Sequence, residues 1–154
     1  MGMAISSDRS ERFAAYAESE IRIEHPVAGS LHLRPLRDGM TVGAFPEPTG
    51  SKIHVITAHN PGRNLSDAEN ATRHRELQRR VAELCGVQSW PAVGGDVEWT
   101  HTEESVAVVG LTDEQAIALG RELEQEAVFA WTPQHLAVLP CDGAAAIAVG
   151  WSLT

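Results

Sequence analysis

The sequence is poor in cysteine, in aromatic residues and in long apolar runs. Two cysteines among 154 residues, without a Cys-x-x-Cys pair, favour reduced thiols over a disulfide framework. No apolar run reaches the ~18 residues that a membrane-spanning helix needs. Residues 1–10 are polar and lack the apolar core of a secretory signal peptide, so we expect a cytoplasmic protein with no membrane partner.

Positive charge is also scarce. Twelve Lys and Arg residues stand against 21 Asp and Glu residues, for a formal net charge of −9, which argues against a nucleic-acid partner. Residues 96–126 hold most of the excess, with nine acidic residues and Arg121 as the one basic residue. A solvated acidic face is the plain interpretation, and a surface for a basic protein partner is the alternative. Eleven of the twelve basic residues are arginine, which suggests a GC-rich bacterial genome.

Residues 1–154 are expected to form a single domain, because this length suits one core and no long linker divides the chain. Two clear N-terminal signals mark helices: Ser66 with Glu69, and Thr112 with Gln115, each form a capping-box pattern. Alternating apolar residues predict a hairpin over 20–36. The expected helices are 8–18, 66–85 and 112–126, and the main later strands are 53–58, 104–110, 127–131, 135–141 and 145–151.

This order predicts an α+β fold in which a mixed or mainly antiparallel sheet carries the two longer helices on one face. Residues 38–50 are expected to form a loop, and residues 87–103 a short excursion or a hairpin. Pro61 predicts an extended conformation at Asn60.

Four motifs occur in register along the chain: V-I-T-A-H-N-P-G-R, S-D-A-E-N-A-T-R-H-R-E-L, W-x(4)-E-S-V-A-V-V-G-L and A-x-x-L-G-R-x-x-x-Q-x-A-V-F. Together they resemble the bacterial domain-of-unknown-function family DUF3293 over residues 16–131. The family often has Phe-Gly where this chain has Leu123-Glu124. The resemblance implies no activity. It implies motif positions, which are Asn60, Glu69, Asn70, Arg73, Glu104, Ser105 and Gln125.

Helix and strand lengths predict where these positions meet. Strand 104–110 and helix 112–126 are each about 22 Å long, so the returning helix should bring Gln125 near Glu104. Asn60 and the start of helix 66–85 join them if strands 53–58 and 104–110 are antiparallel. We favour that arrangement, because it gathers the polar residues at one sheet edge, beside a helix N-terminus suited to an anion.

The candidate catalytic residues are Glu104 and His59. Glu104 opens an apolar strand, where desolvation would raise its pKa into the range of a general acid or base; a structural carboxylate is the alternative. Arg73 is the candidate anion clamp. The remaining candidate ligand-binding residues are Asn60, Asn70, Ser105 and Gln125, and Trp99 is a candidate lid. For Asn60 and Asn70 the alternative is a structural role as turn and cap residues, since asparagine side chains mimic backbone turns.

No cofactor and no metal are expected from motifs. The chain has no G-x-G-x-x-G or phosphate-loop pattern, and Asp96, Glu98, His101 and Glu104 match no established metal spacing. The sequence therefore predicts a small-molecule site that binds or turns over a compact polar or anionic metabolite. The alternative is a non-catalytic module that binds a protein partner through its acidic 96–126 surface.

Overall fold

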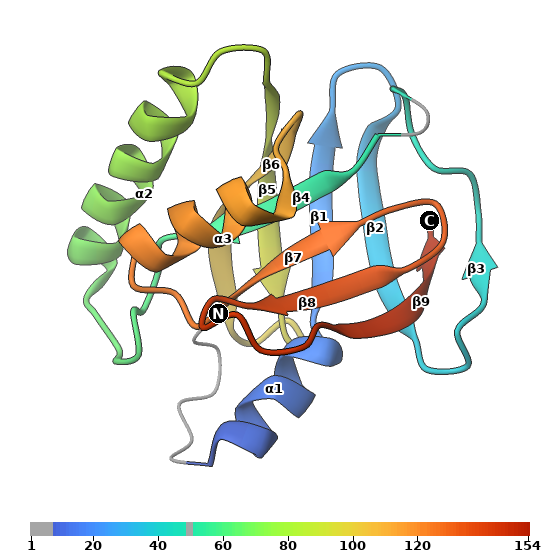
Figure 1. Cartoon of the computed structure of the whole chain (residues 1–154), viewed down its shortest axis with the longest axis horizontal. Helices are drawn as coiled ribbons and strands as arrows, with labels where there is room; N and C mark the ends of the chain where they lie inside the picture. Colours follow the sequence, from blue (N-terminus) through green and yellow to red (C-terminus); the bar gives the residue numbers. More distant parts are fainter. Residues whose placement is uncertain (1–7, 49–50) are drawn as a thin grey trace.

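Eight antiparallel strands close into a barrel, and three helices lie around it (Figure 1). The computed structural model describes residues 8–48 and 51–154. Most of the polar segment 1–10 and the end of the expected loop 38–50 therefore lie outside the described residues. The elements are α1 (Arg9–Ala17), β1 (Glu20–His25), β2 (Gly29–Leu36), β3 (Thr41–Val42), β4 (Ile53–Thr57), α2 (Asp67–Ala82), β5 (Gln88–Gly95), β6 (Thr102–Val109), α3 (Asp113–Glu122), β7 (Ala127–Trp131), β8 (Leu136–Pro140) and β9 (Ile147–Leu153).

The barrel closes between its first and last long strands. The strand order is β2-β1-β5-β6-β4-β7-β8-β9, and β9 pairs with β2 to complete the ring, while β3 adds to β9 in parallel. The α+β class and the mainly antiparallel pairing are confirmed. The closure of the sheet into a barrel was not predicted, and it gives the sheet an inside and an outside. The excursion at 87–103 contains β5, which pairs antiparallel with β6.

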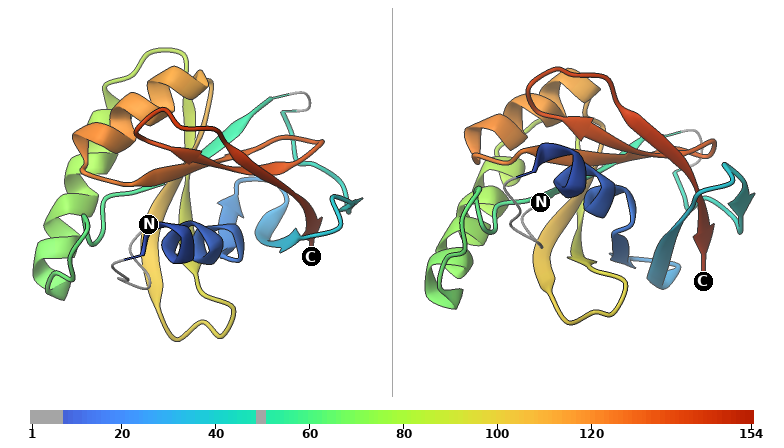
Figure 2. Two further views of the ribbon diagram at one scale, coloured as in Figure 1. Left: turned by 60° about the horizontal axis from the view of Figure 1, so that its bottom comes forward. Right: turned by 90° about the horizontal axis from the view of Figure 1, so that it is seen from below.

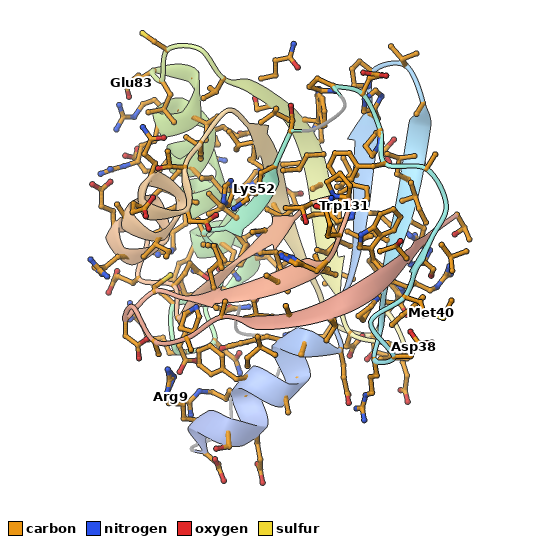
Figure 3. All side chains as sticks on the ribbon, turned by 45° about the vertical axis from the view of Figure 1, so that its right-hand side comes forward. Arg9, Asp38, Met40, Lys52, Glu83 and Trp131 are labelled. Carbon is orange, nitrogen blue, oxygen red and sulfur yellow. The ribbon has the colours of Figure 1, made fainter. Side chains whose placement is uncertain are left out.

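The inside of the barrel is a packed apolar core. Every strand of the ring sends side chains into it, and Trp131, labelled in Figure 3, is fully buried there beside Trp151. Phe13 and Tyr16 of α1 belong to the same cluster. Figure 2 shows α1 lying across one end of the barrel, so this helix closes that end with its apolar face.

A second core lies outside the barrel, under the two longer helices. Leu77 and Val81 of α2 pack with Ala116 and Leu119 of α3 over the outward residues of β4, β6, β7 and β8. The prediction that both helices contribute to one core on the same side of the sheet is confirmed. Both capping boxes are present, Ser66 with Glu69 and Thr112 with Gln115, so the helix starts were readable from sequence.

No helix in the described part of the chain is both long and apolar enough to cross a membrane. Both cysteines are free thiols, with Cys85 exposed and Cys141 buried.

Candidate functional site

The antiparallel pairing of β4 with β6 places the end of β4 beside the start of β6. Thr57 is paired with Ser105, and the Thr57 hydroxyl donates to the carbonyl of Glu104 at 2.8 Å. The predicted antiparallel arrangement is confirmed. The segment that leaves β4, residues 58–60, therefore lies at the same edge as the carboxylates that open β6 (Figure 1).

Three side chains hold the backbone of residues 58–60 in place. The guanidinium of Arg73 donates to the carbonyl of Ala58 at 2.6 Å, and the amide of Gln125 donates to the carbonyl of His59 at 2.9 Å. The side-chain oxygen of Asn70 accepts the backbone N–H of Asn60 at 3.0 Å. These contacts give hydrogen-bond partners to backbone groups of a loop, which has no strand or helix partner to supply them.

Asn60 is the centre of a buried amide network. Its side-chain oxygen accepts from the Asn70 amide and from the backbone N–H of Leu65, both at 3.0 Å. Its side-chain amide donates to the carboxylate of Glu103 at 3.1 Å. Asn60 and Asn70 are each less than a tenth exposed. The network joins the start of α2, the end of β4 and the start of β6.

The prediction that Asn60 is extended is wrong. Its φ is 45°, in the left-handed region that asparagine tolerates better than most residues. The hydrogen bonds to Asn70 and Leu65 stabilise this conformation against the preference that the following Pro61 imposes. The backbone turn directs the chain from β4 into the start of α2.

The held segment presents His59 to a histidine and a carboxylate. One donor atom each from His59, His74 and Glu104 lies within 4.8 Å of the other two. His74 Nε2 is 3.2 Å from Glu104 Oε2, and the rings of His59 and His74 meet edge to face with centroids 6.1 Å apart. Burial lowers the pKa of His59 below its ordinary value, and His74 lowers it further. His59 is therefore neutral near pH 7.

The expected desolvation of Glu104 is wrong. Its side chain is 64% exposed, whereas Glu103 is fully buried. Side chains alternate along a strand, so residues 103, 105, 107 and 109 point into the barrel and residues 104, 106 and 108 point toward the helices. The start of the strand was predicted correctly, but the buried carboxylate there is Glu103 and not Glu104.

Three other predicted site residues, Arg73, Ser105 and Gln125, make structural contacts. Besides Ala58, the guanidinium of Arg73 contacts the carbonyl of Leu123 and the carboxylate of Glu124, and it does not line the pocket described below. Ser105 is 1% exposed and donates to the carbonyl of Glu103. Gln125 lies at the predicted edge, and its amide holds the backbone of His59 instead of reaching for Glu104. These contacts do not support the anion-clamp role of Arg73 or ligand contact by Ser105 and Gln125.

A pocket of about 580 Å³ opens between the start of α2 and the start of β6. We call it the polar pocket. Figure 2 shows the start of α2 and the β5–β6 turn at the same end of the molecule. The pocket is lined by His59, Asn60, Asn64, Leu65, Asp67, Asn70, Ala71, Val93, His101, Thr102 and Glu104.

Trp99 is not a lid on the polar pocket. Its indole N–H donates to Glu20 at 2.9 Å, and the guanidinium of Arg22 lies 4.3 Å from its ring. The ring also rests on Gly95, where an added Cβ would come within 2.6 Å of it. Trp99 therefore packs against β1 and β5 and takes no part in the site.

His74 is the member of the histidine–carboxylate cluster that the sequence analysis missed, and the pocket residues Asn64, Asp67 and Thr102 were not predicted either. It lies one helical turn after Asn70 and one turn before Leu77, on the buried face of α2. The spacing of His74 to Asn70 was the available signal, although charged residues surround it in the sequence.

Comparison with known proteins agrees with the motif analysis. The model of family DUF3293, described as a protein of unknown function, matches residues 56–128. The predicted resemblance is confirmed over this segment, which runs from β4 to β7 and contains the three residues of the histidine–carboxylate cluster. No curated protein and no solved structure gives a match to the chain.

Proposed function

We propose that the protein binds a compact polar metabolite in the polar pocket. The observation that carries this proposal is the convergence of His59, Asn60, Asn70 and Glu104, four of the predicted site residues, on one concave surface. A volume of about 580 Å³ lies within the usual range for small-molecule sites. Leu65 contributes apolar wall between the polar groups.

The lining favours a ligand that is rich in hydrogen-bond donors over a simple anion. Asp67 and Glu104 place two carboxylates on the pocket wall, and no Lys or Arg is among its described lining residues. The guanidinium of Arg73 is engaged with carbonyls and Glu124. Donors on a ligand would meet these carboxylates and the amide oxygen of Asn64. His59 and Glu104 are the groups placed for acid–base chemistry if the ligand is turned over.

The alternative, a protein-interaction module using an acidic surface, has less support. Five of the nine acids in 96–126 pair with a basic or histidine side chain within the chain, namely Glu104, Asp113, Glu122, Glu124 and Glu126. Glu103 is buried. The segment therefore presents much less free negative charge than its composition suggests.

A titration followed by amide NMR tests the proposal. A library of small polar metabolites is added to the protein, and we expect the shifts of a binding compound to cluster at residues 59–71 and 101–104. Thr102→Val removes a pocket hydroxyl with little change of volume and should weaken that binding, whereas Thr132→Val, on the turn before β8, should not. Binding that maps away from these residues, or no binding by any class of compound, would reject the proposal.

A further inference from the structure

We infer that His59, His74 and Glu104 bind one divalent transition-metal ion at the wall of the polar pocket. The three residues come from the loop after β4, from α2 and from β6. Their candidate donor atoms lie within 4.8 Å of one another. The motif analysis predicts no metal, because these residues are far apart in sequence and only the fold brings them together.

The donor set selects the class of ion. Two imidazoles and one carboxylate are the protein ligands of many catalytic zinc sites and of non-haem iron sites. Magnesium and calcium prefer sites made of oxygen atoms. The cluster therefore fits an ion such as Zn²⁺ better than a hard alkaline-earth ion.

The geometry is close to that of a metal site. Metal–ligand bonds of about 2.0–2.1 Å in a tetrahedral site bring donor atoms to about 3.3 Å from one another. His74 Nε2 and Glu104 Oε2 are already 3.2 Å apart. The Glu104 side chain is mostly exposed, so it is free to adjust its rotamer, while the backbone of His59 is fixed through its carbonyl by Gln125.

Two ring nitrogens in the cluster are buried without a hydrogen-bond partner among the described residues. They are His59 Nε2 and His74 Nδ1. A buried polar atom that lacks a partner destabilises the fold, and such atoms need an explanation in a native structure. A metal ion at His59 Nε2 would satisfy one of them.

Three protein ligands leave at least one coordination position for water or another donor. Because His59 and Glu104 line the polar pocket, we expect that position to be reachable from the pocket. The binding of the ion stands without any metabolite. Only the further step, in which a metabolite coordinates the ion, rests on the proposed function.

Isothermal titration of chelator-treated protein with Zn²⁺ alone tests the inference. We expect one ion per chain in the intact protein. His59→Gln, His74→Gln and Glu104→Gln should each weaken binding by at least about 100-fold, the upper end of the loss seen when an outer-shell partner of a metal ligand is removed. His135→Gln removes an exposed histidine on the β7–β8 turn and should leave the affinity unchanged.

Circular dichroism of each variant separates loss of the ion site from loss of the fold. Glu104→Gln is the decisive variant, because the exposed side chain can change without unfolding the protein. Failure of the intact protein to bind one Zn²⁺, or unchanged affinity in folded Glu104→Gln, would overturn the inference. Neither result bears on a metabolite that binds chelator-treated protein, so failure here is distinct from failure of the proposed function.

Discussion

Asn60 and Asn70 hydrogen-bond to each other twice. The Asn70 side-chain oxygen accepts the backbone N–H of Asn60, and the Asn70 amide donates to the Asn60 side-chain oxygen, each at 3.0 Å. Both side chains are buried. This reciprocal pair fixes the turn that follows His59. The two asparagines of the sequence motif therefore line the pocket and also hold its backbone in place.

Asn70→Ala should destabilise the fold. The substitution removes both hydrogen bonds and leaves the buried N–H of Asn60 without its acceptor, which should lower the free energy of unfolding by about 2–3 kcal/mol. Urea denaturation measures the change. Asn64→Ala, at an exposed position six residues earlier, should stay within about 0.5 kcal/mol of the parent protein. Equal effects of the two substitutions would mean that the asparagine pair is not a structural element.

Substitution of Glu103 should destabilise the fold much more than substitution of Glu104. Glu103→Ala removes the acceptor of the Asn60 amide inside the protein and should cost about 2–4 kcal/mol. Glu104→Gln changes a largely exposed carboxylate that lies 3.2 Å from His74 Nε2 and should cost less than about 1 kcal/mol. Thermal unfolding of both variants checks this order. A larger loss for Glu104→Gln would show that Glu104 is chiefly a structural carboxylate.

The fold should lose stability in mild acid through His54. Burial lowers the pKa of His54 below its ordinary 6.5, although the hydrogen bond to Asp113 opposes the shift and Lys52 reinforces it. The unfolded chain therefore gains this proton at a higher pH than the folded chain. The free energy of unfolding is fully retained above about pH 6.5 and falls as the pH drops toward the lowered pKa.

Urea denaturation between about pH 7.5 and 5.5 measures that slope. His54→Gln should flatten it, because the titrating group is gone while a hydrogen bond to Asp113 remains possible. Since the pKa of His59 is also lowered, part of the slope should persist in the variant. An identical slope in both proteins would contradict the assignment to His54.

Glu124→Gly should stabilise the protein. Glu124 has a φ of 60°, at the position where the resembled family often has glycine, and its ion pair with Arg73 is loose at 3.4 Å with Glu124 62% exposed. Relief of the left-handed strain should raise the free energy of unfolding by about 0.5–1 kcal/mol after the entropy of glycine is counted. Ala118→Gly, at an exposed position inside α3, should lower it by about 1 kcal/mol.

Local signals in the sequence predicted much of this fold. The capping residues Ser66 and Thr112 marked both longer helices because their side chains bond to the helix within a single turn. The closure of β2 onto β9 was not predictable, since it pairs Leu33 with Leu153, and pairing over such a distance leaves no local pattern. The closure of a barrel depends on the number, tilt and register of all its strands.

The site was predictable in place but not in composition. The lengths of strand and helix placed Gln125 at the sheet edge, where its amide donates to the carbonyl of His59. The face on which Glu103 or Glu104 lies depends on strand parity, and a shift of one residue exchanges them. His74 entered the site only through the tertiary packing of α2. The motif residues Asn70, Arg73 and Gln125 mainly hold the backbone of residues 58–60. His59 and His74, two of the three residues in the histidine–carboxylate cluster, are next to motif residues in the sequence.

Anomalous X-ray diffraction from crystals soaked in Zn²⁺ tests the central claim most directly, namely that the motif holds His59 in a metal-binding cluster. We predict one strong anomalous peak at about 2.0–2.2 Å from a nitrogen of His59, a nitrogen of His74 and an oxygen of Glu104. A map with no peak at these three residues, or with zinc bound only at exposed histidines such as His135, would contradict the account.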